Sequence, residues 1–433
     1  MNNQIESLKN KGLKLDWNLN SSDENTIVVY IATDESESSV EKFKERVKTA
    51  IYHKVITNLK SINSNVLSLK KEEVYEVMKD LCDYFYPYHN GLNTCAITGT
   101  NGKTTTVDFI RQLLMIKKQS VLTIGTMGVY FNEKRVDDFS LTSPHYIDFR
   151  KMINKYQLQL DFLAVESSSH AIDQKRQYRF QFDFIGWTSF SQDHLDYHKD
   201  LEEYFNVKKK LQEQCKNKFI ISKKAGTFKE KIEREEVDYS LETKNQFLRV
   251  DYNKINLDVA LGILERFNLK FSTDEIDKIK PTPGRFNVFD NKDQLIIIDF
   301  AHSPDGLENI LISINKSFNK KVVCVFGCGG NRDKTKRPLM GSIAEKLSDN
   351  VIVTSDNPRD EEPQAIIDDI IMGLKDKNVI SMVDRKEAIE YAIKNYPDSI
   401  ILIAGKGHED YIEAKGKRIK YSDINVVKEV LKC

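Results

Sequence analysis

Short apolar runs alternate along most of the chain with stretches whose apolar residues recur at helical spacing. Between residues 93 and 280 the apolar runs predict strands, and Asn256–Phe267 predicts a helix. The predicted strands are Cys95–Thr98, Val121–Ile124, Phe162–Val165, Phe184–Thr188 and Phe219–Ser222. Strands that alternate with helices indicate a mainly parallel sheet covered by helices on both faces.

The alternation is most regular after the Thr282-Pro283-Gly284 junction, where it predicts a second α/β domain of the nucleotide-binding type. The predicted strands are Leu295–Phe300, Val322–Phe326, Val351–Thr354, Val379–Val383 and Ile400–Ala404. The predicted helices cover residues 306–316, 338–347, 363–375, 385–395 and 423–432.

The first 90 residues predict a small third domain. They contain a strand candidate at Thr26–Ala32, a charged helical stretch at Val40–Ala50 and further helical patterns up to Phe85. The loop from Tyr86 to Gly91 is a plausible domain boundary, because Pro, Asn and Gly interrupt regular structure there.

Length and composition narrow the classes of protein. A chain of 433 residues is too long for a single core and indicates two or three domains. Its 65 Lys and Arg balance its 65 Asp and Glu, which argues against nucleic acid as a partner. The chain opens without an apolar signal core, no apolar run reaches membrane-spanning length, and the six cysteines lack metal or disulfide spacing. We therefore expect a cytoplasmic protein without membrane insertion.

The strongest chemical signal is the glycine loop, residues 98–106, which reads TGTNGKTTT. It lies between an apolar strand and a helical stretch that begins at Val107, the arrangement that wraps backbone N–H groups around a polyphosphate. Lys103 is then placed for the β- and γ-phosphates, and the Thr104 hydroxyl for Mg²⁺. The loop is shorter than the usual pattern, and the alternative is a Gly-rich turn with a solvated lysine. The flanking elements favour a nucleoside triphosphate site.

Further polar groups follow the predicted strands of the central region. Glu166 ends the strand Phe162–Val165, where a carboxylate suits Mg²⁺, although a capping or salt-bridging role is the alternative. The segment 191–198 combines two histidines with two acids, which indicates either a metal site or structural histidines. Lys208 lies in a run of three lysines, which by itself predicts a solvated helix face.

In the C-terminal region the polar clusters also follow strand ends, where parallel sheets place ligand sites. The loop 327–337 carries four cations and suits a phosphate or carboxylate, unless it is only a charged surface loop. Arg359 offers a guanidinium for a substrate carboxylate, and Glu409 a carboxylate for a substrate ammonium. Together they would recognise the zwitterionic end of an amino acid.

Taken together, these motifs resemble the Mur ligases, and among them the enzymes that add the third residue to the peptidoglycan stem. The resemblance covers about residues 95–425, and the motifs occur in the family's order. They read GTNGKTTT, ESSSHAIDQKR, DHLDYH, TPGRF, DFAHSPDGL, FGCGGNRDKTKRPLMG, DNPRDEEP and GKGHEDY.

The resemblance implies an α/β fold with three domains. It assigns residues 1–90 to a small, divergent N-terminal α/β substrate domain and residues 91–281 to a central P-loop ATPase-like parallel sheet. Residues 282–433 become a C-terminal Rossmann-like domain that binds the amino acid. Domain closure is implied as well, because residues of the third domain must reach ATP bound on the second.

The implied reaction is ATP-dependent amide ligation, with ATP and Mg²⁺ as cofactors and small molecules as the other partners, by a monomer. An acceptor carboxylate is phosphorylated, an amine attacks the acyl phosphate, and phosphate leaves. By position in the motifs, the resemblance gives Lys103, Glu166, His194 and Lys208 catalytic roles. Thr104, Glu166, His194 and a carbamylated Lys208 are the implied metal ligands, which replaces the solvated-face interpretation of Lys208.

The resemblance also assigns the substrate contacts. ATP contacts are implied for Gly99, Thr100, Asn101, Gly102, Lys103, Thr104, Thr105, Asn256, Arg285, His302 and Asp305. Acceptor contacts are implied for Thr142, Ser143, Ser169, Gln174 and Arg176. Amino-acid contacts are implied for Arg332, Asp356, Asn357, Arg359, Gly405 and Glu409. The DNPR and GKGHE strings match enzymes that use meso-diaminopimelate rather than lysine.

Two departures from the family pattern leave open the hypothesis of a different acceptor substrate. The N-terminal region lacks the Asp-Ser-Arg segment and the Gly-rich stretch that ordinarily bind uridine diphosphate, and the central region is short between Lys210 and Asn253. The first hypothesis is ligation of meso-diaminopimelate to UDP-N-acetylmuramoyl-L-alanyl-D-glutamate in peptidoglycan biosynthesis. The second is a Mur-type ligase that uses a non-uridine carboxylate, and the third a non-catalytic nucleotide-binding regulator.

Overall fold

The computed structural model describes residues 5–9, 12–32, 36–60, 63–88, 91–139, 141–195, 197–240, 242–375 and 379–432. Asp196 of the 191–198 segment and part of the predicted boundary loop, residues 89–90, lie outside these ranges. The chain forms two compact units. The first consists of Met1–Thr98, Leu114–Ile185 and Val207–Phe219, and the second of Gly99–Leu113, Gly186–Asn206 and Ile220–Cys433.

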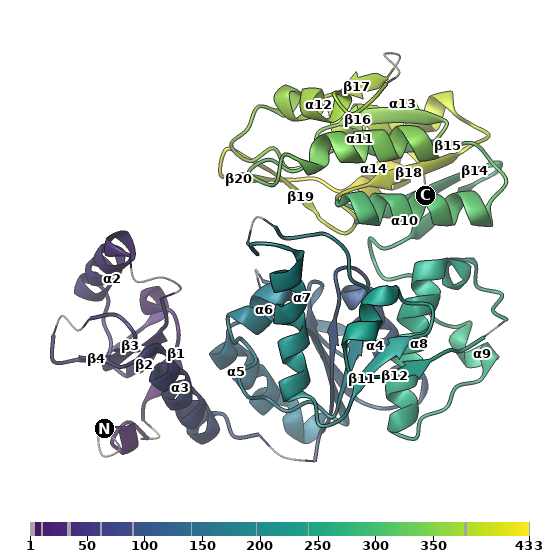
Figure 1. Cartoon of the computed structure of the whole chain (residues 1–433). Coiled ribbons are helices and arrows are strands. Elements are labelled where there is room, and N and C mark those ends of the chain that lie inside the picture. The colour runs from purple at the N-terminus through teal and green to yellow at the C-terminus, as the bar shows by residue number, and fades with distance from the viewer. Residues whose placement is uncertain are drawn as a thin grey trace. The chain divides into compact units, whose positions relative to one another are not determined.

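The N-terminal residues form a four-stranded parallel sheet of order β1-β2-β3-β4 together with the helices α2 and α3 (Figure 1). Phe43 and Val47 of α2 pack on Val28 and Val55 of the sheet, and all four side chains are buried. The elements are β1 (Lys14–Asp16), β2 (Thr26–Tyr30), β3 (Lys54–Thr57), β4 (Val66–Ser68), α2 (Glu37–Thr49) and α3 (Lys71–Phe85). The sequence predicted only β2, because the other strands have three or four residues each.

The central sheet has eight strands in the order β12-β11-β10-β5-β9-β6-β7-β8. Strands β5, β9 and β6 run parallel, whereas β6, β7 and β8 form an antiparallel meander. The strands are β5 (Asn93–Thr98), β6 (Val121–Gly125), β7 (Gly128–Phe131), β8 (Lys134–Asp137), β9 (Phe162–Glu166), β10 (Phe184–Trp187), β11 (Phe219–Ser222) and β12 (Arg234–Val237). The helices are α4 (Lys103–Ile116), α5 (Tyr146–Tyr156), α6 (Ser169–Asp173), α7 (Leu201–Lys209), α8 (Asp251–Arg266) and α9 (Thr273–Ile276).

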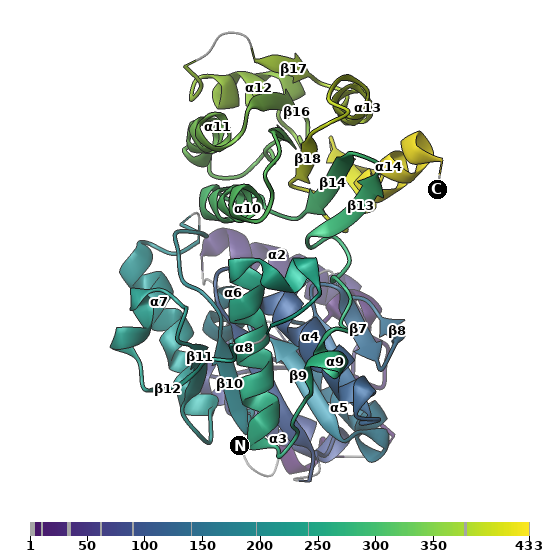
Figure 2. The same cartoon turned by 90° about the vertical axis from the view of Figure 1, so that its right-hand side faces the viewer.

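The C-terminal sheet has the order β13-β14-β18-β15-β16-β17, and all neighbours are parallel except β13 and β14. Helices α13 and α14 cover one face of this sheet, and α10, α11 and α12 lie on the other (Figure 2). The strands are β13 (Asn287–Asn291), β14 (Gln294–Asp299), β15 (Val322–Phe326), β16 (Asn350–Thr354), β17 (Ile380–Met382) and β18 (Ile400–Ala404). The helices are α10 (Pro304–Ser317), α11 (Lys336–Leu347), α12 (Pro363–Ile371), α13 (Arg385–Asn395) and α14 (Asp423–Leu431).

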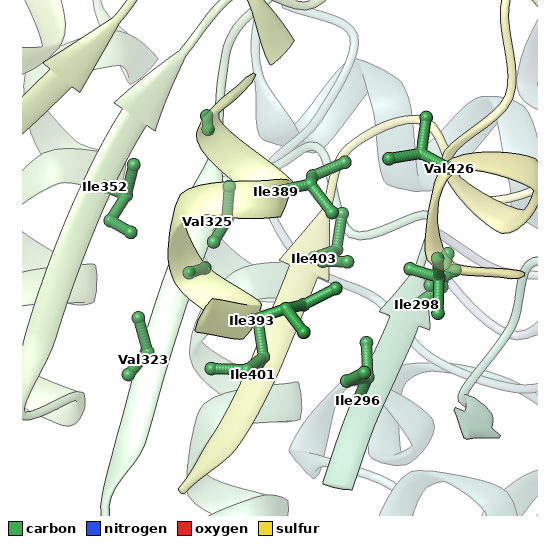
Figure 3. Packing of buried hydrophobic residues seen from close by; sticks show 13 residues of the cluster. Ile296, Ile298, Val323, Val325, Ile352, Ile389, Ile393, Ile401, Ile403 and Val426 are labelled. Atoms are coloured by element: carbon green, nitrogen blue, oxygen red, sulfur yellow. The ribbon is translucent and has the colours of Figure 1, made fainter. Parts of the chain in front are cut away.

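The core of this sheet follows from the two-residue period of its strands. Ile296 and Ile298 face the same side of β14, and Ile401 and Ile403 the same side of β18 (Figure 3). There they pack against α13, including Ile389. Apolar residues between them, such as Ile297, are buried too, so these strands read as continuous apolar runs. Burial of both faces explains why these strands could be predicted from the sequence.

Several predicted boundaries differ from the structure. The helix predicted at 306–316 begins at Pro304, because the Ser303 Oγ accepts a hydrogen bond from the Gly306 N–H at 3.2 Å and caps the first turn. The helix predicted to reach residue 375 ends at Ile371, before Gly373. Strand β13 and the hairpin of β19 (Tyr411–Ala414) and β20 (Lys417–Lys420) were not predicted, because they are short and partly exposed.

Single-turn 3-10 helices complete the regular structure, at Leu19–Ser21, Gln157–Gln159, Lys210–Gln214, Thr227–Lys231 and Gln246–Arg249. Within the described part of the chain, every helix is too short or too polar to cross a bilayer. The parallel strands place the loops after β14, β15, β16 and β18 at one edge of the C-terminal sheet, as the sequence predicted.

A buried ion pair supports two of those loops. Arg385 and Asp423 are both fully buried and pair through two hydrogen bonds of 2.9 and 2.8 Å. The same guanidinium donates to the Ala404 carbonyl at 2.9 Å and to the Ser355 carbonyl at 3.3 Å, where β18 and β16 end. Desolvation lowers the pKa of Arg385, but Asp423 raises it more, so the net pKa is raised.

We expect the Arg385→Met variant to lose about 3–5 kcal/mol of unfolding free energy, because it leaves the Asp423 carboxylate buried without its partner. The control is Lys386→Met, which removes the exposed pair with Glu429 at 3.0 Å and should leave stability almost unchanged. Urea unfolding monitored by circular dichroism measures both. Equal unfolding midpoints for the two variants would contradict the assignment.

Candidate active site

The glycine loop connects β5 to the first turn of α4, as predicted. Gly102 has φ +89°, and a Cβ there would lie 2.2 Å from the Asn256 Oδ1 on α8. The residue must therefore be glycine both for its backbone angle and for the close approach of α8. The contact also places Asn256 directly against the glycine loop, whereas its contact with adenine stays a prediction.

Lys103 is the first residue of α4, and its ammonium lies over the loop. It donates to the Gly99 and Thr100 carbonyls at 2.9 and 2.8 Å. Thr104 and Thr105 follow in the first helical turn and are buried. The backbone N–H groups of a helix N-terminus together with a lysine form a suitable cradle for phosphate oxygens.

The end of β10 holds the loop in shape. Ser189 Oγ accepts from the Asn101 N–H at 2.9 Å and donates to the Asn101 carbonyl at 3.0 Å. The Ser189 carbonyl accepts from the Thr100 N–H at 2.9 Å, and Thr188 Oγ1 donates to the Asn101 carbonyl. We did not single out Thr188 or Ser189 from the sequence, although Thr188 ends a predicted strand and Ser189 directly follows it, and a position after a strand is the signal that identified Glu166.

Asp305 also meets the glycine loop. Its Oδ2 accepts from the Asn101 amide at 2.9 Å and from the Ser191 hydroxyl at 2.8 Å. Two residues that were predicted separately as ATP contacts, Asn101 and Asp305, are therefore in direct contact.

His302 lies near charged groups of both signs. Burial and the Lys336 ammonium lower the pKa of His302, and Asp193 opposes them, so the net pKa is lowered. Burial raises the pKa of Asp193, but the opposing effect of His194, His302 and Lys336 is larger, so the net pKa is lowered. His302, in the loop after β14, and the Asp193 carboxylate therefore interact electrostatically.

Arg285 stacks on an aromatic side chain. Its guanidinium carbon lies 4.2 Å from the centre of the Phe300 ring. The same ring packs against His302 and His408, with centroids 4.7 and 5.2 Å away. Arg285 and His302, both predicted nucleotide contacts, therefore share one aromatic support.

In the first compact unit, Glu166 is the buried end of β9. The Thr126 N–H and hydroxyl donate to its two carboxylate oxygens at 2.8 and 3.0 Å. The Thr126 hydroxyl also lies 3.2 Å from that of Thr142. A predicted metal ligand and a predicted acceptor contact are thus joined through Thr126, which sequence reasoning missed.

The remaining acceptor residues gather around Ser143. Its hydroxyl donates to the Glu166 carbonyl at 2.7 Å, and its own carbonyl accepts from Arg176 at 3.0 Å. Arg176 also donates to the Gln174 side chain at 2.6 Å. The Ser169 Oγ is buried and has no hydrogen-bond partner among the described residues. These residues form a polar patch with a fixed guanidinium.

Lys208 contradicts the solvated-face interpretation that its lysine run suggested. Its side chain on α7 is 1 % exposed, whereas the following Lys209 and Lys210 are exposed. His194 has φ +55°, and its Nε2 lies 3.5 Å from Asp193 Oδ2. Over the described ranges, no three His, Cys, Asp or Glu side chains converge as a metal cluster.

The residues predicted to bind the amino-acid substrate converge at the ends of β16 and β18. Asn357 donates to the Glu409 carboxylate at 2.8 Å. Arg359 donates to the Gly330 carbonyl at 2.7 Å and pairs with Glu413 of the unpredicted hairpin at 3.2 Å. A Cβ on Gly405 would lie 2.6 Å from the Asp356 carboxylate, so those two predicted residues are adjacent as well. Arg332 is exposed on the loop after β15.

Comparisons with known proteins agree with this arrangement. Residues 97–289 match the Mur ligase middle domain, and residues 284–407 match the Mur ligase, glutamate ligase domain. The UDP-N-acetylmuramoyl-L-alanyl-D-glutamate--2,6-diaminopimelate ligase of Aquifex aeolicus is 38 % identical over 387 residues, which cover 82 % of this chain and 80 % of that one. The ligase of the same name from Clostridium perfringens is 34 % identical over 433 residues, covering 90 % and 88 %.

Solved structures show the same fold. A structure of a UDP-N-acetylmuramoyl-L-alanyl-D-glutamate--2,6-diaminopimelate ligase aligns with a TM-score of 0.63 at 25 % identity, covering 96 % of this chain and 94 % of that one. The MurF ligase from Thermotoga maritima in complex with ADP aligns with a TM-score of 0.58 at 14 % identity, covering 98 % of both chains. The chain belongs to the Mur ligase family.

Proposed function

We propose that this protein is the ATP-dependent ligase that joins meso-diaminopimelate to UDP-N-acetylmuramoyl-L-alanyl-D-glutamate in peptidoglycan biosynthesis. The observation that carries the proposal is the pairing, in one compact unit, of the glycine loop with a site containing Arg359 and Glu409. The names of the relatives support the same acceptor and the same amino acid. They favour this hypothesis over a non-uridine acceptor and over a non-catalytic regulator.

The reaction has two chemical steps. An acceptor carboxylate oxygen attacks the γ-phosphorus of ATP, ADP leaves, and an acyl phosphate forms. The uncharged amine of the amino acid then attacks the acyl carbon, loses a proton, and phosphate departs with the former carboxylate oxygen. Lys103 and the first turn of α4 stabilise the negative charge that moves among the phosphate oxygens.

The donor set suits Mg²⁺, which prefers hard oxygen ligands. Thr104 supplies a hydroxyl and Glu166 a carboxylate held by Thr126, and we assign His194 and a carbamylated Lys208 to the same role. The ion would neutralise charge on the transferring phosphoryl group. The buried position of Lys208 supports the carbamate, because only an uncharged amine reacts with CO₂ and burial disfavours the charged ammonium.

The acceptor and amino-acid roles follow from the same contacts. We assign Thr142, Ser143, Ser169, Gln174 and Arg176 to the acceptor, and Arg176 supplies the positive charge that an acceptor with several carboxylates needs. Arg359 takes the distal carboxylate of the diamino acid and Glu409 its distal ammonium. We assign residues 1–90 to the acceptor handle, 91–281 to ATP and 282–433 to the amino acid, in a cytoplasmic monomer.

Phosphate release from ATP is expected only when both UDP-N-acetylmuramoyl-L-alanyl-D-glutamate and meso-diaminopimelate are present. Acceptor labelled with oxygen-18 in its carboxylate should transfer one label to the released phosphate, because that oxygen bonds to phosphorus in the acyl phosphate. A matrix of acceptors and amino acids, read by phosphate release and mass spectrometry, tests both points. Turnover with a non-uridine acid and none with the UDP precursor would overturn the proposal.

The Lys208→Ala variant is expected to lose roughly 100-fold in kcat, because it removes an anion from the phosphoryl-transfer site. The neighbouring Lys209→Ala variant is the control: it shortens a lysine side chain at an exposed position and should keep wild-type turnover. Steady-state phosphate release measures both. Full activity in Lys208→Ala would exclude the carbamate.

Gly102→Ala is expected to weaken ATP binding at least about 10-fold, because a Cβ at this position collides with Asn256 and displaces the glycine loop. Gly91→Ala is the matched control, since a Cβ there would have no atom within 4 Å. Titration with a fluorescent ATP analogue gives the dissociation constants. Equal affinity of both variants would show that the loop does not hold the nucleotide.

A further inference from the structure

The GKGHE loop contains a charged side chain to which neither the sequence nor the proposed reaction gave a role. Lys406 lies between Gly405 and Gly407, directly after β18, and it is fully buried. A buried ammonium is stable only when partners replace its water. Lys406 has two such partners, and both belong to the amino-acid site.

The first partner is Glu409. Lys406 Nζ lies 3.0 Å from the Glu409 Oε2, in a side chain that remains 20 % exposed. The second partner is Asn357, whose Oδ1 accepts from Lys406 at 2.9 Å while its Nδ2 donates to the same Glu409 Oε2 at 2.8 Å. The three side chains form a closed triangle of hydrogen bonds.

This triangle fixes the orientation of the Glu409 carboxylate. Two donors hold Oε2, so the second oxygen, Oε1, is the acceptor for an incoming ammonium. A carboxylate fixed before binding loses less conformational entropy when the ligand arrives. Asn357 is held in turn by the Glu413 N–H, which donates to its Oδ1 at 2.9 Å.

The surrounding backbone explains why Lys406 points inward. Gly405 has φ +117°, and a Cβ there would meet the Asp356 carboxylate at 2.6 Å. The left-handed backbone at Gly405 therefore ends β18 close to Asp356, and the next side chain, Lys406, is buried there. The Tyr411 ring of the hairpin lies 5.8 Å from the ammonium and covers it.

We propose that Lys406 is a positioning residue, whose buried ammonium holds Glu409, together with Asn357, in the orientation that recognises the distal amino group of the diamino acid. The inference rests on the proposed function and names a determinant of its amino-acid selectivity. It assigns no contact between Lys406 and the substrate.

The test compares meso-diaminopimelate with 2-aminopimelate, which keeps the distal carboxylate but lacks the distal amino group. In Lys406→Met we expect the KM for diaminopimelate to rise about 10- to 100-fold, the usual effect of losing a hydrogen bond between charged groups. The KM for 2-aminopimelate and the KM for ATP should each change less than about 3-fold. Glu409→Gln should show the same pattern, and the double variant should be no worse than either single one.

Two further variants keep the test decisive. Lys417→Met removes the same charge from the exposed strand β20 and should leave every constant unchanged. Lys406→Gln keeps a polar side chain in the buried position and should show a smaller loss of the same selectivity, with a thermal melt confirming its fold.

The possible failures are distinguishable. If the wild-type protein ligates neither amino acid, both the proposed function and this inference are wrong. A wild type that prefers diaminopimelate, beside Lys406 variants that keep the same preference or lose both substrates equally, overturns the inference alone.

Discussion

Several charged groups at the candidate site are buried, and each of these depends on a neighbour that replaces the water it has lost. The Glu166 carboxylate takes two hydrogen bonds from Thr126, and the Lys406 ammonium is shared by Asn357 and Glu409. A buried charge without such partners costs several kcal/mol, which is comparable to the whole stability of a domain. Pairing therefore decides which side chains can function at these positions, and it fixes their orientation as well.

Parallel topology supplies those neighbours. In the C-terminal sheet the strands β18, β15 and β16 end side by side, so the loops that follow them contact one another although they are far apart in sequence. Asn357 and Glu409 meet in this way across 52 positions. Beneath them Arg385 binds the carbonyls of Ser355 and Ala404 and thereby fixes the starting points of both loops.

The sequence predicted the parts of this arrangement that depend on residues close together in the chain. The strands of the C-terminal sheet are buried on both faces, so each appears as an apolar run, and the polar clusters directly follow those runs. The family models and the relatives confirmed the predicted Mur ligase family, and the solved structure confirmed the α/β fold. The individual site roles and the domain boundaries stay predictions.

What the sequence did not predict depends on long-range contacts. Thr126 has no motif of its own, and its role appears only because β6 lies beside β9 and brings it to Glu166. Lys208 was interpreted as solvated, because a run of three lysines does not reveal which of them faces the interior of the fold. The hairpin β19–β20 was missed because its strands are short and exposed, although it supplies Glu413 and Tyr411 to the site.

That hairpin changes how the amino-acid site selects its ligand. Arg359 is paired with Glu413, and Glu409 with Lys406, and Arg332 and Asp356 add one charge of each sign, so the site is balanced in charge before any substrate arrives. The distal end of a diamino acid, with one carboxylate and one ammonium, is also neutral overall. Net charge therefore attracts such a ligand no more than any other zwitterion. Selectivity must come from the fixed distance between the guanidinium and the carboxylate, and that distance is set by the buried pairs behind them.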